Sequence, residues 1–407
     1  MNKGFRPLLA FFVLAIAVVA CALPLGIDAP TASPDEVSTV VALTLQAPTP
    51  SSDPGASPEP VAGLLPHSLY SLGTNSAGLT QVFRIERDGT TKSQVTSETV
   101  NVLGFGVSPV DGSVSYIIEN QLLLVNADGS GRRLLVEGEP IDENNPFVNR
   151  ISNPVFSPNG ETLAYSHMGL NLYSLSAGVN NLVLENQIDD IGSGLLFPKE
   201  LYVPEKYSPD GSKLLITLAY YEGASAAIYY PESRSLVRLS GAEGAFICCG
   251  NQSWTEDGST FYSANPSMGM FSSGMWRVDA ATGTVTTLLP GEAGEGIYNI
   301  PDEPYLAPDG QLYYFFAQVA APDGFVVRPP LQIVRSAPDG VTGRTVIRED
   351  TFELMNEAIW FPDASAVIVA IAPNPDVYMG GQAEILYLDG RPNVRLTSFA
   401  QEMEWGP

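Results

Sequence analysis

The chain has 407 residues, of which 45 are Asp or Glu, 20 are Lys or Arg, 3 are Cys and 2 are His, giving a formal net charge of −25 at pH 7. A negative electrostatic field repels nucleic acid and anionic lipid and favours cationic or basic partners. The alternative is that the negative charge serves only to keep the protein soluble. The two histidines, His67 and His167, argue against a histidine-based triad, and neither a Gly-x-Ser-x-Gly elbow nor a His-Glu-x-x-His helix occurs.

The first 21 residues have the form of an export signal. Lys3 and Arg6 supply the positive end, and the apolar run at residues 8–20 is too short to span a bilayer as a helix. The run ends in Val18-Val-Ala-Cys21, which resembles the bacterial lipobox. This resemblance implies that Cys21 is lipidated and anchors the mature chain to a membrane. The alternative is an ordinary cleavage site with a chance cysteine.

Residues 22–66 are rich in Pro, Ser, Thr and Ala, and nine of them are proline. Such a composition is typical of a semi-extended tether. The sequence therefore predicts three parts, a lipoprotein signal peptide at 1–21, a tether at 22–66 and one folded domain at 67–407.

The folded part repeats a turn motif at intervals of about fifty residues, the size of one four-stranded blade. The motif is an aromatic or aliphatic residue, then Ser-Pro-Asp-Gly or a close variant, then an alternating apolar run. Proline presets φ and glycine accepts positive φ, so the motif predicts a hairpin. Ala364 stands where glycine is expected, and we expect that turn to relax into another type. The copies begin at Val107, Phe156, Tyr207, Trp254, Leu306 and Phe361.

Further hairpins lie between the turn motifs. Seven of them can be counted in the sequence, but it contains only six turn motifs. The mismatch is resolved if residues 402–405 form an inner strand that pairs with residues 69–72, because one C-terminal strand and three N-terminal strands then complete the first blade. Such closure removes free sheet edges. The sequence therefore predicts an all-β, seven-bladed β-propeller closed by both chain ends, with six blades as the alternative.

Long loops follow the second and fourth strands of the predicted blades and share one face, the usual place for binding on a rigid scaffold. Nine such loops, including 186–202, 289–302, 318–330 and 372–382, hold sixteen acids against three bases. Aromatic side chains amid charge are typical of an interface core. The candidate binding residues are Asp189, Asp190, Tyr220, Tyr221, Phe246, Met270, Phe271, Asp302, Glu303, Phe325 and Tyr378.

Cys248 and Cys249 are adjacent in the sequence. Neighbouring Cα atoms lie about 3.8 Å apart, below the usual spacing of a disulfide, so a bridge between them would be strained. Two states remain open in an exported chain, a vicinal disulfide or two free thiols. Because no Cys-x-x-Cys pair or nearby histidine could complete a metal site, the sequence predicts no metal and no cofactor.

The repeat, as in Tyr207-Ser-Pro-Asp-Gly-Ser-Lys-Leu214, resembles that of TolB-type propellers, also called WD40-like or PD40 repeats. The resemblance covers residues 69–407 and implies an extracytoplasmic protein-binding platform. Neither the α/β domain that precedes the propeller in TolB nor the peptidase domain of related prolyl peptidases is found in this sequence, so neither specific function carries over.

Two functions remain. The first is a lipid-anchored lipoprotein of the bacterial envelope, at the cell surface or in the periplasm, whose monomeric propeller binds a protein or a basic or cationic ligand without catalysis. No nucleic-acid partner is expected. The alternative is a hydrolase or lyase that acts on glycans or peptides with carboxylates of the long-loop face. Two carboxyl groups converging in a central pocket with aromatic walls would favour the enzyme.

Overall fold

The structure is a computed structural model and describes residues 63–192, 194, 196–221, 223–240, 251–266, 273–320 and 328–407. The chain divides into the units Met1–Pro60 and Val61–Pro407, and all described residues belong to the second. These residues form strands and turns without a helix. Accordingly, within the described part of the chain, no helix has the length and apolarity needed to cross a membrane.

The strands of the N-terminal half are short and antiparallel, with bounds as follows: β1 (Leu69–Thr74), β2 (Thr80–Ile85), β3 (Lys92–Gln94), β4 (Gly104–Val107), β5 (Val114–Ile118), β6 (Gln121–Val125), β7 (Arg133–Glu137), β8 (Ser152–Phe156), β9 (Thr162–Ser166), β10 (Gly169–Ser174), β11 (Val179–Glu185), β12 (Gln187–Asp190), β13 (Leu196–Tyr207) and β14 (Leu214–Tyr220).

The C-terminal half continues in the same way, with β15 (Gly223–Tyr230), β16 (Ser235–Arg238), β17 (Asn251–Trp254), β18 (Thr260–Asn265), β19 (Gly274–Asp279), β20 (Val285–Leu289), β21 (Glu292–Gly294), β22 (Ile297–Leu306), β23 (Leu312–Ala320), β24 (Gln332–Ser336), β25 (Thr345–Val346), β26 (Met355–Trp360), β27 (Ala366–Ile371), β28 (Gly381–Tyr387) and β29 (Val394–Trp405).

The last strand belongs to two blades. β29 pairs with β28 through its first half, where Val394 lies opposite Ile385, and with β1 through its second half, where Trp405 lies opposite Leu69. The predicted pairing of residues 402–405 with residues 69–72 is therefore present. The resulting sheet has the order β26-β27-β28-β29-β1-β2-β3 and divides at β29 into two four-stranded parts.

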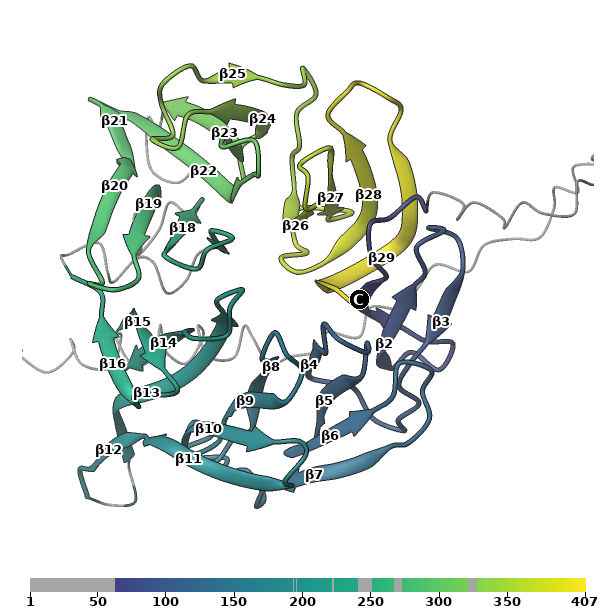
Figure 1. The fold of residues 1–407 in the computed structure, drawn as a ribbon, viewed down its shortest axis with the longest axis vertical. Coiled ribbons are helices and arrows are strands. Elements are labelled where there is room, and N and C mark those ends of the chain that lie inside the picture. Colours follow the sequence, from purple (N-terminus) through teal and green to yellow (C-terminus); the bar gives the residue numbers. More distant parts are fainter. Residues whose placement is uncertain are drawn as a thin grey trace, which may run out of the picture. The chain divides into compact units, whose positions relative to one another are not determined.

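The other five sheets each contain one consecutive four-stranded meander, to which β12 and β21 are added as extra edge strands. Counted with the two parts that share β29, the described residues form seven four-stranded blades. We call the part with β1–β3 blade 1 and number the others in chain order. Within the unit that begins at Val61, the blades follow one another around a ring, with β4, β8, β13, β22 and β26 toward its centre (Figure 1).

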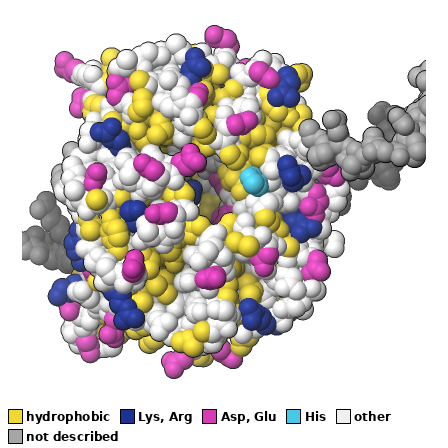
Figure 2. All heavy atoms as spheres, in the orientation of Figure 1, with side chains coloured by type: hydrophobic (Ala, Val, Ile, Leu, Met, Phe, Trp, Pro, Cys, Tyr) yellow, Lys and Arg dark blue, Asp and Glu magenta, His cyan; other side chains and the backbone are white. Residues whose placement is uncertain are grey.

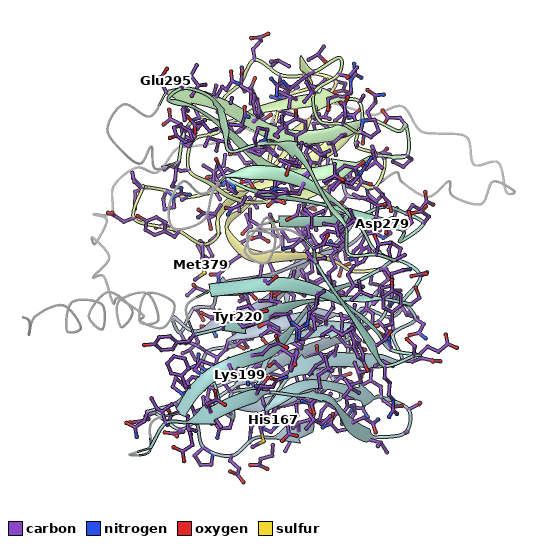
Figure 3. All side chains as sticks on the ribbon, turned by 90° about the vertical axis from the view of Figure 1, so that its left-hand side faces the viewer. His167, Lys199, Tyr220, Asp279, Glu295 and Met379 are labelled. Carbon is purple, nitrogen blue, oxygen red and sulfur yellow. The ribbon has the colours of Figure 1, made fainter. Side chains whose placement is uncertain are left out.

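The two faces of this ring carry different connections. Tyr220, Lys199 and Met379, which lie in or beside long connections, project toward one face, and Asp279, at a tight β19–β20 turn, lies toward the other (Figure 3). We call these the long-loop face and the short-turn face. Figures 1 and 2 look onto the short-turn face.

The repeated turns adopt the expected geometry, with one correction. Gly160, Gly211 and Gly310 have φ values of 69°, 71° and 77°, the left-handed region that glycine enters without strain. Ala364 was expected to leave this conformation, but it keeps φ at 55°. Two bonds hold it there, from Ala364 N to Phe361 O at 2.9 Å and from Ser365 N to Asp363 Oδ1 at 2.9 Å. The methyl side chain of Ala364 is buried in the core, and this burial offsets the cost of the backbone strain.

The hydrophobic core lies between neighbouring blades. Between blades 6 and 7, for example, the Phe315 ring centroid lies 5.8 Å from those of both Phe352 and Trp360. Phe315 is fully buried, as a face-to-face packing of two sheets requires. The alternating apolar runs of the sequence thus supply the apolar side chains on both faces of each blade.

Two segments that the sequence predicted to be long loops are largely strands. Residues 187–190 and 196–207 form β12 and β13, and residues 292–294 and 297–306 form β21 and β22. The structure therefore lengthens blades 4 and 6 beyond the expected hairpins. Asp302 and Glu303, expected in a loop, lie within the inner strand β22.

Candidate functional site

Bulges in the inner strands position a set of charged side chains. The pairing register shifts between Pro204 and Lys206 in β13, between Asp302 and Tyr305 in β22, and between Met355 and Glu357 in β26. An extra residue in one strand turns side chains out of the regular alternation. Glu303 has φ at 47° and Glu402 at 54°, which marks the same local irregularity in β22 and β29.

Three glutamates at these bulges connect consecutive blades. Glu303 Oε1 accepts a hydrogen bond from Ala358 N at 3.0 Å, and Glu404 Oε2 accepts one from Val107 N at 2.9 Å. Glu357 Oε1 accepts the N–H of Met403 in the same way. The carboxylates of blades 6, 7 and 1 thus each reach the inner strand of the next blade, across the point where the ring closes.

Two indoles make the reverse connection. Trp405 Nε1 donates to Trp360 O at 3.0 Å, and Trp360 Nε1 donates to Glu303 O at 2.9 Å. Trp405 and Trp360 therefore each reach back to the preceding blade. Together the carboxylates and indoles fix the inner strands of blades 6, 7 and 1 relative to one another, because both sets satisfy polar groups that would otherwise lose hydrogen bonds.

These side chains surround a cavity of about 590 Å³ on the axis of the ring. All seven inner strands contribute to its lining, and Pro109, Pro158 and Pro362 of the short turns line it as well. Figure 2 shows a hollow at the centre of the short-turn face with acidic side chains around it. We call this space the axial cavity. Its charged lining residues are Glu205, Lys206, Glu303 and Glu404, and Tyr305, Trp360 and Trp405 add aromatic walls.

Enclosure by protein shifts the pKa values of these groups. Burial raises the pKa of Glu205 and of Glu357 to about 7 and that of Glu404 to about 8, and neighbouring carboxylates add to the shift of Glu404. Burial also lowers the pKa of Lys206, against the opposing attraction of Glu303 and Glu404. Water nevertheless reaches the Lys206 side chain inside the cavity. The cavity is therefore a wet, enclosed site in which charge is costly unless it is matched.

The predicted binding residues do not come together in one place. Asp189 and Asp190 lie exposed on β12, the strand that extends blade 4 toward the long-loop face. Tyr221 stacks on Phe197 with the ring centroids 3.8 Å apart, and Tyr220 ends β14 half-buried beside it. These residues form one group at the edge of blade 4. Asp302 is buried in β22, and of the predicted residues that the structure describes, Glu303 alone lines the axial cavity.

Tyr378 belongs to a separate, preformed loop on the long-loop face. Its side chain is 67% exposed and lies beside the Arg328 guanidinium, 5.7 Å from ring centroid to Cζ. Arg328 also donates to Val377 O at 2.8 Å, and Asn356 Nδ2 donates to Gly380 O at 2.6 Å. The loop therefore presents Tyr378 from a fixed backbone, as interface anchors are commonly presented.

The remaining expectations fall on residues outside the described part of the chain. They concern the signal peptide and lipidation at Cys21, the tether, the cysteines Cys248 and Cys249, and the candidate residues Phe246, Met270, Phe271 and Phe325.

The axial cavity was missed as a site, although the sequence holds a signal for it. Acidic residues recur within three positions before the residue that opens the turn motif, as at Glu205 before Tyr207 and at Glu303 before Leu306. Regular alternation along a strand assigns such residues to one face of a blade and not to the axis of the ring. No group of three His, Cys, Asp or Glu side chains among the described residues is placed to hold a metal ion.

No protein-family model and no curated protein matches the chain. Among solved structures, a manganese complex of oligogalacturonate lyase matches with a TM-score of 0.52 and 11% identity over 81% of this chain and 84% of the lyase. The fold is that of a β-propeller. TolB from Acinetobacter baumannii also matches, with a TM-score of 0.43 and 16% identity over 85% of this chain and 68% of TolB. A prolyl endopeptidase matches with a TM-score of 0.49 and 11% identity over 84% of this chain and 51% of that protein.

At these identities the likeness concerns the fold alone, because propellers carry many unrelated functions. The match to the lyase agrees with the all-β fold of the described residues, and TolB proteins are among the matches. The substrates and partners of these proteins say nothing about this chain. Function has to be argued from the site.

Proposed function

We propose that this chain is an envelope lipoprotein, anchored through Cys21 and facing outside the cytoplasm, whose propeller binds a positively charged partner without catalysis. The lipobox-like Val18-Val-Ala-Cys21 and the Pro-rich tether support the anchor. The propeller fold, a net charge of −25 and the axial cavity support the binding role. The partner we favour is a protein that presents a Lys or Arg side chain.

One observation carries the choice of a cationic ligand: the axial cavity already accommodates an ammonium group. Lys206 lies on the cavity wall, and the Glu303 and Glu404 carboxylates both attract its charge. No ion pair of Lys206 with any described residue lies within 4.0 Å, so its charge is only partly matched. The acids on the wall outnumber this one base, and a second cation would reduce their mutual repulsion.

The three inter-blade carboxylates argue for binding rather than catalysis. Glu303, Glu357 and Glu404 each hold a backbone N–H of the next blade. Each bond occupies one carboxylate oxygen and restricts the orientation of the side chain. Glu303 and Glu404, which line the axial cavity, are therefore suited to a fixed electrostatic wall, which stabilises a bound cation without reorganising.

The binding proposal is tested with a fluorescently labelled lysine-rich peptide and the full-length protein, measured by anisotropy at low salt. Glu404→Gln keeps an acceptor for Val107 N and removes the charge, so it is expected to weaken binding. Glu232→Gln, an exposed acid in the β15–β16 turn, is the matched control and is expected to have no effect. Equal binding of an acidic peptide, or equal loss in both variants, would contradict the proposal.

A second candidate is a hydrolase or lyase that acts on a glycan or peptide. It is favoured by the presence of several carboxyl groups beside Tyr305, Trp360 and Trp405 in one cavity. In that case Glu404→Gln abolishes the release of reducing ends or free amines from oligosaccharide or peptide substrates, while Glu232→Gln leaves it intact. Absence of turnover in the unmodified protein with both substrate classes removes this candidate.

A further inference from the structure

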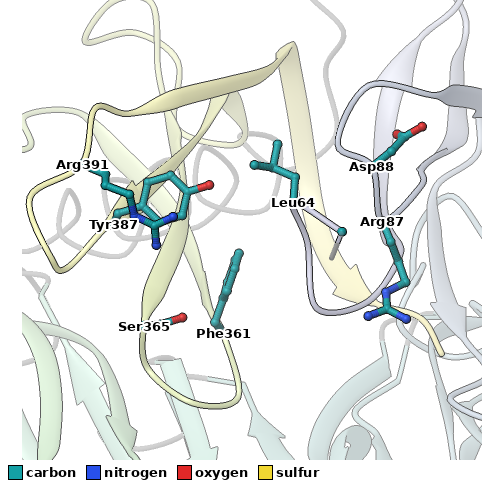
Figure 4. Close-up of a pocket in the computed structure, with 8 residues that line it drawn as sticks. Leu64, Arg87, Asp88, Phe361, Ser365, Tyr387 and Arg391 are labelled. Atoms are coloured by element: carbon teal, nitrogen blue, oxygen red, sulfur yellow. The ribbon is translucent and has the colours of Figure 1, made fainter. Parts of the chain in front are cut away.

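A second cavity, separate from the axial cavity, lies on the short-turn face where the ring closes. Its volume is about 660 Å³, and it lies between turns of blade 7 and the β2–β3 turn of blade 1 (Figure 4). Phe361, Ser365, Tyr387 and Arg391 line it from blade 7, and Gly63, Leu64, Arg87 and Asp88 line it from the opposite side. We call it the seam cavity.

The apolar part of the seam cavity lining is held in place. Phe361 is fixed against Trp405, with ring centroids 5.7 Å apart in an edge-to-face arrangement. Leu64 packs over Gly89, where a Cβ would stand 2.3 Å from the Leu64 Cδ2. The turn must therefore carry glycine at this position for Leu64 to reach the cavity. Leu65 N donates to Arg87 O at 2.9 Å, which ties this segment to the turn.

Arg391 is held in one orientation with part of its guanidinium unused. Its Cζ lies 3.9 Å from the centroid of the Tyr387 ring, and its Nε donates to Asp389 Oδ2 at 2.8 Å. Neither terminal NH₂ group bonds to any described residue. A guanidinium fixed through Nε and stacked on a ring presents its remaining donors as a ready fork for a planar anion.

The other polar groups around the seam cavity do not compete for these donors. The two oxygens of Asp88 accept bonds from Thr90 N, Thr91 N and Thr91 Oγ1, all at 2.6–2.8 Å, and these bonds lower the pKa of Asp88 to about 2. Both carboxylate oxygens of Asp88 thus accept hydrogen bonds within its own turn. The Arg87 side chain has no hydrogen-bond or ion-pair partner among the described residues. The charged donors left free in the cavity are therefore those of the two arginines.

We propose that the seam cavity binds a small aromatic carboxylate whose anionic group meets Arg391, while Arg87 adds a positive charge at the opposite wall. In Figure 4 these two side chains stand on opposite sides of the cavity, with the Phe361 ring and Leu64 between them. The ring of the ligand packs against Phe361, and its carboxylate accepts hydrogen bonds from the terminal NH₂ groups of Arg391. An amine of the same shape is rejected because both charged donors would face it. The site is independent of the cationic ligand proposed for the axial cavity.

The test uses the full-length protein, with N-acetyl-tryptophan as the probe and its uncharged amide as the matched ligand, in isothermal titration calorimetry. We expect the acid to bind with a Kd of about 0.1 mM, the strength that a ligand of this size commonly reaches. The amide is expected to bind about tenfold more weakly, since it cannot form charge-assisted hydrogen bonds.

Three variants locate the binding. Arg391→Gln is expected to weaken binding of the acid about tenfold and to bring it level with the amide, and Arg87→Gln, across the cavity, is expected to weaken it by less. Arg133→Gln, an exposed arginine on β7 in blade 2, is the matched control and leaves binding unchanged. Ser365→Tyr fills the cavity from an exposed position and is expected to abolish binding while the thermal unfolding temperature is maintained.

The proposal is overturned if the acid and the amide bind equally, if neither arginine variant weakens binding, or if the acid does not bind at about 10 mM. None of these results bears on the cationic ligand proposed for the axial cavity, because binding there is measured with the lysine-rich peptide and with other variants.

Discussion

Glu404, next to last in the final strand, accepts a hydrogen bond from the backbone N–H of Val107, where the second blade turns, with 2.9 Å between Oε2 and the nitrogen. Residues nearly three hundred positions apart thus meet at the inner edge of neighbouring blades. The side chain is both part of the ring closure and part of the axial cavity wall. Its two roles can be separated by substitution.

Glu404→Ala is expected to destabilise the protein more than Glu404→Gln. Alanine leaves Val107 N without its acceptor, at a cost of about 1–3 kcal/mol in the free energy of unfolding. Glutamine retains an acceptor and removes a charge that burial disfavours, so at pH 8 it is expected to be at least as stable as the unmodified chain. Urea denaturation followed by tryptophan fluorescence measures both. Equal stability of the two variants would show that the bond contributes nothing.

The free energy of unfolding is expected to fall as the pH rises from about 5 to about 8. The pKa values of Glu205, Glu357 and Glu404 are about 7, 7 and 8 in the folded chain, against an ordinary value of 4.5. In this range the folded chain therefore holds protons that the unfolded chain has released, and stability declines as they are lost.

Urea denaturation at several pH values measures this slope. Glu357→Gln is expected to flatten it, because glutamine does not titrate, and Glu232→Gln, which is exposed, keeps it unchanged. A stability that rises with pH across this range would contradict the assignment of raised pKa values to the axial cavity.

Removal of residues 402–407 is expected to prevent cooperative folding. The deletion takes away the strand that pairs with β1 and the indole bond from Trp405 to Trp360, and it uncovers Leu69 and Tyr70, which are fully buried. The free edge of β1 would then be open to pairing with other chains. Calorimetry and size-exclusion chromatography detect both effects. Removal of Pro407 alone is the control and is expected to preserve a single unfolding transition.

Lys206→Met is expected to tighten the binding of the lysine-rich peptide about tenfold. The substitution removes the cation that the cavity already holds while keeping a long side chain on the wall. Anisotropy at two salt concentrations measures the change, and Lys199→Met, on β13 at the long-loop face, is the control. Unchanged affinity in Lys206→Met would place the peptide outside the axial cavity.

Cys21→Ser is expected to release the protein from the membrane fraction. Serine has no thiol to carry the acyl chains that the proposed lipobox would attach. Fractionation of the envelope and labelling with a palmitate analogue measure the effect. Cys248→Ser, which changes the same kind of residue in the folded part, should stay membrane-bound and labelled. Retention of label in Cys21→Ser would disprove the lipobox assignment.

The ring closure could be predicted because its signals are local. The turn motif fixes backbone geometry within five residues, and the short segment Glu402–Trp405 reads as an inner strand that lacks its partner. The pairing of Trp405 with Leu69 then follows from the need to remove free edges. Ala364 shows the limit of this reasoning, because the penalty for a left-handed alanine is outweighed by bonds and burial that the sequence does not display.

The candidate site could not be predicted because its geometry depends on bulges in the inner strands. Alternation along a strand assigns side chains to two faces, and each bulge reverses the assignment for the residues that follow. Glu205 and Glu303 reach the axial cavity for this reason. In β13, Pro198 and Pro204 made a strand resemble a loop, since proline is tolerated at an edge or a bulge but rarely inside a sheet.

The division of β29 between two blades also determines when the ring can close. The first blade lacks its inner strand until residues 401–405 have been synthesised, so a shorter nascent chain cannot close the ring. A chain truncated before these residues keeps the inner edge of β1 unpaired and is therefore expected to be cleaved by proteases more readily than the closed ring.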